Sequence, residues 1–146
     1  MLTPVMIRML EAAAGQLKTE VMKDVTTNPR TKFLHHMSLD ELEGRVLDLY
    51  SNLDRWLTER RESDIQLVYQ DLGGRRYKEG VPLHEFVFAM LLVKEHLWSF
   101  IRRNDVLTSE VDTYQQEELG QMIGTFFDRA VYHAVKGYEL ARMMDE

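Results

Sequence analysis

Histidine is the residue type with the widest chemical options in this sequence. A helical zinc-protease site needs two histidines four residues apart with an adjacent glutamate, and that spacing is absent, as is the Glu-x-x-His motif of di-iron bundles. His96 and His133 lie at the margins of apolar stripes, where either could be an axial ligand of a haem. The alternative interpretation of both is a half-buried histidine bonded to a carbonyl or carboxylate group. The full set is His35, His36, His84, His96 and His133.

Paired arginines are a second candidate for chemistry. The doublets at residues 60–61 and 102–103 fall at the ends of predicted helices, where cations complement the helix dipole. Arg75 and Arg76 lie instead in a glycine-rich helical segment. We expect a structural ion pair between this doublet and Glu85, and the alternative is a site that holds an anion or a partner.

Motifs of nucleophilic catalysis are absent. The chain contains no cysteine and no Gly-x-Ser-x-Gly elbow, and Gly73-Gly74 is not followed by the Lys-Ser/Thr of a phosphate loop. Carboxylates at positions 40, 41 and 43 are expected to complement a helix start rather than to act in acid–base chemistry. The sequence therefore predicts a domain that is not an enzyme and carries no cofactor.

Aromatic and methionine side chains are expected to fill the core. The chain has nine methionines, whose flexible side chains suit a core or an adaptable pocket. A helical fold of this kind can keep a residual cavity among its large side chains. The candidate pocket residues are Phe86, Met90, Trp98, Phe126 and Phe127.

Five amphipathic helices must position these residues, because apolar side chains recur at helical spacing in five segments. They cover about residues 4–25, 38–61, 63–80, 82–103 and 109–146. The first stripe is expected to bury Val5, Met9, Ala13, Leu17 and Val21, and the last is expected to bury residues from Tyr114 to Tyr138. Five such helices with short connections predict an all-α, globin-like bundle.

Local signals mark the helix ends. Thr3 with Pro4, and Ser109, are expected to begin the first and last helices, and Ser38 with Glu41 forms a capping-box pattern. Gly73-Gly74 is expected to bend or stop the third helix, and Gly80 to terminate that region. The last helix shows no stop signal, which predicts that it continues towards an effector domain.

Composition excludes several classes of protein. The 146 residues are 45% hydrophobic and 29% charged, as expected for one folded domain covering residues 1–146. A net charge of −6 argues against nucleic-acid binding. The longest apolar run is eight residues, residues 86–93, so membrane insertion is not expected. The absence of cysteine and of a signal peptide fits the cytoplasm.

Three short motifs resemble the N-terminal domain of RsbR-type stressosome proteins and related sensor histidine kinases. They are Gly80-Val81-Pro82-Leu83, Leu97-Trp98 with Ile101, and Lys136-Gly137-Tyr138-Glu139. The resemblance implies a non-haem, globin-like fold that dimerises and controls a C-terminal effector.

The expected function is therefore a signal-input and dimerisation domain. Its partners would be a second copy and the effector, with a small-molecule signal as a further possibility. The alternatives are a haem-dependent gas or redox sensor that uses His96 or His133, and an adaptor that binds another protein.

Overall fold

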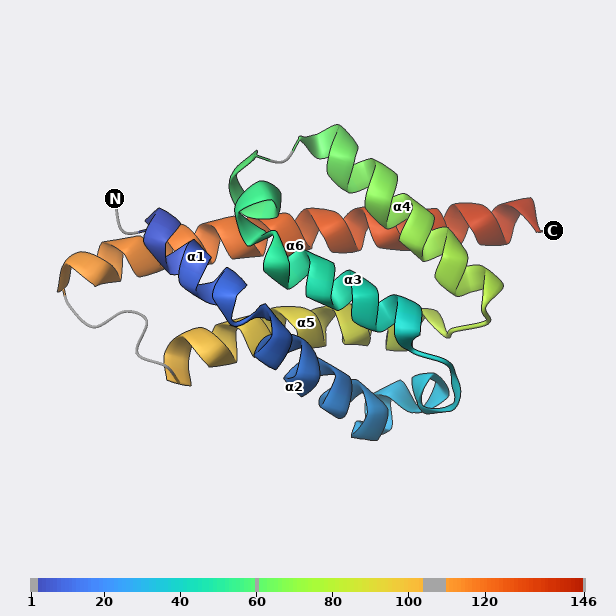
Figure 1. The fold of residues 1–146 in the computed structure, drawn as a ribbon. Helices are drawn as coiled ribbons and strands as arrows, with labels where there is room; N and C mark the ends of the chain where they lie inside the picture. The colour runs from blue at the N-terminus through green and yellow to red at the C-terminus, as the bar shows by residue number, and fades with distance from the viewer. Residues whose placement is uncertain (1–2, 60, 104–109, 146) are drawn as a thin grey trace.

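The last helix, α6 (Glu110–Met144), runs the length of the molecule, and the first, fourth and fifth α-helices pack along it (Figure 1). The computed structural model describes residues 3–59, 61–103 and 110–145. All regular structure in these residues is helical, which confirms the all-α class. The segments are α1 (Thr3–Ala12), α2 (Ala14–Thr27), the 3₁₀ helix η1 (Pro29–His36), α3 (Asp40–Ser51), the π-helical turn η2 (Arg55–Glu59), α4 (Glu62–Lys78), α5 (Leu83–Arg103) and α6 (Glu110–Met144).

The first predicted helix is two helices, because the chain breaks at Ala13. This residue leaves helical geometry with φ −93° and ψ 9°. The break changes which side of α1 faces the core, since Met6, Ile7 and Leu10 are buried. The prediction that Val5 and Met9 are buried is therefore wrong, and both are exposed. Beyond the break, Leu17 and Val21 are buried as predicted.

The start of α3 does not use the predicted capping box. Leu39 is the residue that precedes the helix, and no side chain caps its first turn. The Glu41 carboxylate binds arginines instead, as described below. The prediction for Ser109 lies outside the described residues.

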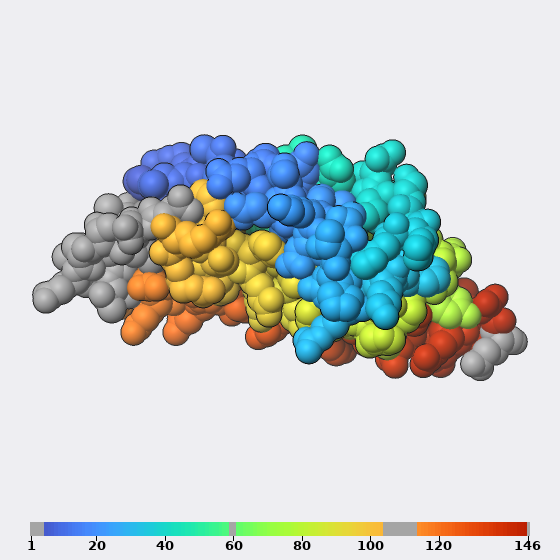
Figure 2. All heavy atoms as spheres, turned by 90° about the horizontal axis from the view of Figure 1, so that it is seen from below, coloured from blue at the N-terminus to red at the C-terminus, as the bar shows by residue number. Residues whose placement is uncertain are grey.

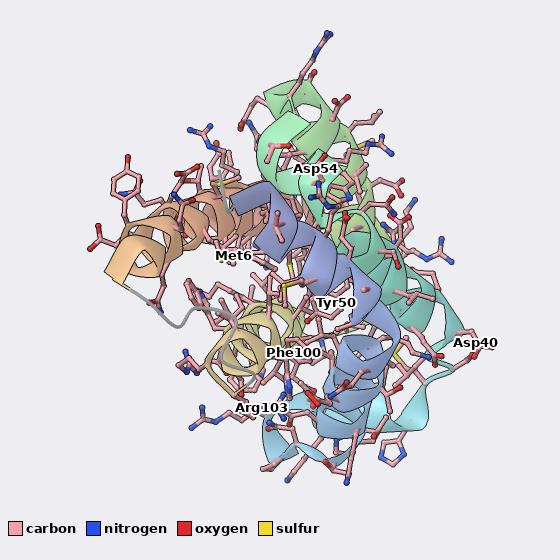
Figure 3. The ribbon with its side chains drawn as sticks, turned by 60° about the vertical axis from the view of Figure 1, so that its left-hand side comes forward. Met6, Asp40, Tyr50, Asp54, Phe100 and Arg103 are labelled. Carbon is pink, nitrogen blue, oxygen red and sulfur yellow. The ribbon has the colours of Figure 1, made fainter. Side chains whose placement is uncertain are left out.

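The second predicted helix is likewise interrupted, between α3 and η2, yet its apolar stripe remains in the core. Trp56 and Leu57 of η2 are buried together with the α3 residues Leu49 and Tyr50. The Tyr50 hydroxyl donates a hydrogen bond of 2.6 Å to the carbonyl oxygen of Val93 and so ties α3 to α5. Figure 3 shows Met6, Tyr50 and Phe100 among the interior side chains, with Asp40 on the outside.

Helix α4 continues through Gly73-Gly74, contrary to the predicted bend or stop. Gly80 ends the region as predicted, with a φ of +83° that favours glycine. Helix α5 then begins at Leu83 and ends at Arg103, close to the predicted limits.

The longest helices form the frame of the molecule. Helix α5 runs opposite to α6, and α4 crosses α6 towards its C-terminal end (Figure 1). Seen from below, α5 lies between α2 and α6 (Figure 2). Tyr114 is exposed near the start of α6, contrary to prediction, whereas residues from Leu119 to Tyr138 supply its buried stripe. Every helix in the described part of the chain is too short or too polar to span a lipid bilayer.

Candidate functional site

An apolar cavity of about 60 Å³ lies where η1, α3, α4, α5 and α6 meet. Its walls are mainly aliphatic and aromatic, with Val46 on α3, Leu72 on α4 and Ala89 on α5 as examples. The exceptions are two arginines, Arg45 and Arg76. A wall of this kind suits a small apolar group with a polar end.

Three of the five predicted pocket residues line this cavity. They are Phe86 and Met90 on α5 and Phe127 on α6. The other two lie elsewhere. Phe126 packs in an aromatic cluster, with its ring centroid 5.6 Å from that of Trp56 and 5.9 Å from that of Tyr69. Trp98 is half-buried on α5 and faces Gly120 of α6.

Arg76 is the most buried charged side chain in the described residues, with 5% of its surface exposed. Its two terminal nitrogens donate hydrogen bonds to the two oxygens of the Glu41 carboxylate, a bidentate pair with N···O distances of 2.8 and 3.0 Å. Nη1 also donates to Glu79 at 2.9 Å. Burial of an unpaired guanidinium would cost folding free energy, and these hydrogen bonds offset that cost.

Glu41 is the centre of an arginine cluster. Besides Arg76, it accepts hydrogen bonds or ion pairs from Arg45 Nε at 2.8 Å and Arg75 Nε at 3.0 Å. The predicted partner of the doublet, Glu85, is wrong: its carboxylate accepts the backbone N–H of Phe33 at 2.9 Å. The ion pair expected for Arg75 and Arg76 therefore exists, but with a carboxylate of α3.

The cluster shifts the titration of its members. Burial alone would raise the pKa of the Glu41 carboxyl, but hydrogen bonds from Arg76 and the charges of Arg76 and Arg45 outweigh burial and lower it. Burial would lower the pKa of the Arg76 guanidinium, and the hydrogen bond and charge of Glu41 raise it instead. Both groups stay charged across the physiological range.

Beside the cavity, α4 and α6 are in direct backbone contact at two glycines. A Cβ atom added to Gly73 would overlap the carbonyl oxygen of Ala134 and lie 2.7 Å from the nitrogen of Tyr138. A Cβ added to Gly137 would overlap the carbonyl oxygen of Gln70. The two helices make the most extensive contact of any pair in the described residues.

Polar contacts hold both ends of this crossing. At the start of α4, the Glu62 carboxylate binds Arg129 at 2.8 Å and Nε2 of His133 at 2.7 Å. At the far end, the Tyr77 hydroxyl donates to Asp145 at 2.8 Å. These pairs and the glycine contact join α4 to α6 and its C-terminal end from the first turn of α4 to its last.

The histidines considered for haem are both bound to carboxylates. His96 lies 2.8 Å from Asp24, and His133 is paired with Glu62. The buried Nδ1 atom of His133 has no hydrogen-bond partner among the described residues. Neither imidazole lines the cavity, whose volume is below the roughly 150 Å³ that admits benzene. These residues do not fit a haem.

Sequence reasoning missed Glu41, Arg45 and Glu79 as members of the arginine cluster. A local signal was present, since Glu41 precedes Arg45 by four residues and Arg76 precedes Glu79 by three, spacings that pair on a helix. The contact between Glu41 and Arg76 spans 35 residues and has no such local signal.

Comparison with known proteins assigns the chain to no family. No protein-family model, no curated protein and no solved structure matches the chain.

Proposed function

We propose that this chain is a signal-input and dimerisation domain, in which occupation of the cavity moves α4 and α6 together. The observation that carries the proposal is the backbone contact at Gly73 and Gly137 beside a cavity that α4 and α6 both line. Backbones in contact cannot slide past each other independently, so a displacement of α4 is passed to α6. Adding volume to a close-packed core shifts the backbone around it, and this is how a filled cavity would displace α4.

The output end is the C-terminal part of α6. Its last turns extend beside the end of α4 at one end of the molecule (Figure 2). Met143 and Met144 are exposed there, at 65% and 88%. In the proposal this segment leads to an effector domain of the same protein, as in the stressosome proteins and sensor kinases that the sequence motifs resemble. A globin-like arrangement and a location in the cytoplasm belong to the same proposal.

Dimerisation is assigned to α1 and α6. Both helices present exposed apolar or aromatic side chains, among them Val5 and Met9 on α1 and Tyr132 on α6. Two copies that share these surfaces would bring two α6 helices together, and a shift of one against the other is a typical switch. The net charge of −6 makes nucleic acid an unsuitable partner.

An NMR experiment on the full chain tests the transmission step. Ala89→Leu adds bulk to the cavity wall, and Gln16→Leu places a leucine at an exposed position of α2, which lies outside the proposed dimer interface. We expect Ala89→Leu to shift the backbone amide resonances of residues 136–144, and Gln16→Leu to leave them in place. If Leu at position 89 prevents folding, Ala89→Val makes a smaller change of the same kind. Unmoved resonances in a folded position-89 variant would refute the proposal.

A further inference from the structure

We infer that the cavity binds a small organic monocarboxylate whose carboxylate replaces Glu41 on the Arg76 guanidinium. The inference rests on the proposed function, because it names the signal that the cavity would detect. It starts from the position of Arg76, which both lines the apolar cavity and holds a carboxylate in bidentate geometry.

The Arg76 fork is already arranged for a carboxylate. A planar guanidinium with two parallel N–H groups matches the two oxygens of one carboxylate, and burial strengthens such a bond. In the structure Glu41 occupies this position from α3, with 29% of its side chain exposed. Glu41 is therefore the internal counter-ion of an arginine that lines the cavity, and a competing carboxylate can take its place on that arginine.

The surrounding charges favour an anion. Three guanidinium groups, those of Arg45, Arg75 and Arg76, converge on the single carboxylate of Glu41. Glu79 is the second close carboxylate, at 2.9 Å from Arg76. Asp71 lies 3.6 Å from Arg45 with 75% of its side chain exposed, so water screens its charge. A ligand carboxylate that takes the place of Glu41 would meet the same three cations.

The cavity limits the rest of the ligand to a short apolar tail. Its volume of about 60 Å³ is less than half of the roughly 150 Å³ that holds a benzene ring. Side chains such as Leu72, Val93 and Phe86 form the walls and offer no polar partner. A tail of about three carbons fits these limits, and a charged or hydroxylated tail would lose its hydration without compensation.

Replacement of Glu41 would also change the link between helices. The pair of Glu41 with Arg76 joins α3 to α4, and α4 is fixed to α6. A bound carboxylate that takes the Arg76 fork removes the most buried of the ion pairs between α3 and α4, which leaves the more exposed pairs of Arg75 with Glu41 and of Arg45 with Asp71 and so loosens this link. The same exchange would thus both recognise the ligand and start the signal.

A titration of the full chain with butyrate, followed by amide NMR, tests this inference. We expect saturable shifts at Arg45 and Arg76, and binding of 1-butanol, which has the same tail without the charge, about tenfold weaker. Glu41→Gln removes the competing carboxylate and should tighten butyrate binding by about threefold or more. Glu43→Gln is the matched control on the same helix turn, where the carboxylate pairs with Lys18, and should leave the affinity unchanged.

The outcomes separate the inference from the proposed function. Equal binding of butanol and butyrate, or no saturable butyrate binding to folded Glu41→Gln protein, overturns the carboxylate assignment and leaves the proposed function standing. Saturable, Glu41-dependent butyrate binding that leaves residues 136–144 unmoved upholds the assignment and contradicts the proposed function. If circular dichroism shows that Glu41→Gln is unfolded, Glu79→Gln removes the other competitor and carries the same expectation.

Discussion

Glu41 has the largest number of ionic contacts of the carboxylates described here, and its role is decided by partners that are remote in sequence. Its position four residues before Arg45 is a local feature of the helix, but Arg76 reaches it from α4. The capping-box pattern with Ser38 predicted a local role for the same carboxylate. The structure shows that three guanidinium groups compete more effectively for it than one backbone N–H.

Removal of this carboxylate should destabilise the fold. Glu41→Ala leaves the buried Arg76 with Glu79 as its remaining close acceptor. Because Glu79 stays and Glu41 is partly exposed, we expect a loss of about 2 kcal/mol in unfolding free energy, below the 3–5 kcal/mol of a fully buried pair. Urea denaturation measures this loss. Glu43→Ala removes a more exposed pair with Lys18 and should cost about 1 kcal/mol or less. Equal losses in the two variants would show that the buried pair has no special role.

Acid should weaken the ion pairs of Glu41 and Asp24. Hydrogen bonds from His96 and Asn28 outweigh the effect of burial and lower the pKa of Asp24, and the arginines lower the pKa of Glu41. A carboxyl group with a lowered pKa in the folded state stabilises the protein above its unfolded pKa of about 4, and this contribution is lost as the pH falls further. We expect the unfolding free energy to drop below about pH 4.5, and to drop less steeply in Glu41→Gln. Identical pH profiles for the two proteins would contradict this account of Glu41.

At the scale of helices, the crossing of α4 and α6 depends on one particular glycine of the Gly73-Gly74 pair. A Cβ at Gly73 would overlap the backbone of Ala134, whereas a Cβ at Gly74 would have its nearest neighbour 3.8 Å away, at the Cβ of Ala141. We therefore expect Gly73→Ala to lower the unfolding free energy by about 2 kcal/mol or more. Gly74→Ala should instead raise it, by up to about 1 kcal/mol, because alanine favours the helix. Thermal and urea unfolding of the two variants measure both effects, and a tolerated Gly73→Ala would show that the backbones are not in tight contact.

Sequence periodicity predicted the elements where one stripe continues without interruption. Helix α5 and the stripe of α6 from Leu119 to Tyr138 followed the 3.6-residue period, because one face of each helix meets the core throughout. In α1 the same reasoning failed, since the break at Ala13 rotated the buried face to Met6 and Ile7. The predicted bend or stop at Gly73 follows from the low helix propensity of glycine, which is local information, whereas the close approach of α6 depends on tertiary packing.

The apolar part of the candidate site could be predicted from the sequence, and its polar part could not. Phe86, Met90 and Phe127 were expected in a pocket because large apolar side chains on adjoining helices converge on the core, and they line the cavity. Phe126 satisfied the same pattern but fills another part of the core, and Trp98 lies half-buried against Gly120 of α6. The polar rim depended on the contact of Glu41 with Arg76, which no spacing in the sequence encodes.

In its quaternary structure, we expect the protein to be a homodimer. Met9 is 50% exposed on α1, a helix that also contacts α6, and its side chain is available to a second copy. Met9→Glu should place a charge in the interface and raise the dimer dissociation constant by about tenfold or more. Sedimentation equilibrium measures the constant. Leu67→Glu introduces the same charge at an exposed position of α4, outside the proposed interface, and should leave it unchanged. A chain that is monomeric at tens of micromolar would contradict the prediction of a dimer.

The proposed signal requires α4 and α6 to move as one unit when the cavity is filled, and distances between spin labels measure this motion. The chain has no cysteine, so spin labels can be attached to pairs of introduced cysteines. One cysteine of each pair replaces Met143 on α6, and the other replaces Leu47 on α3 or Leu67 on α4; all three positions are exposed. Dilution of labelled chains with unlabelled chains restricts the measurement to distances within one chain. On introduction of Ala89→Leu, we expect the distance between positions 47 and 143 to change while the distance between positions 67 and 143 stays constant. A change in the second distance, or no change in either, would contradict the claim.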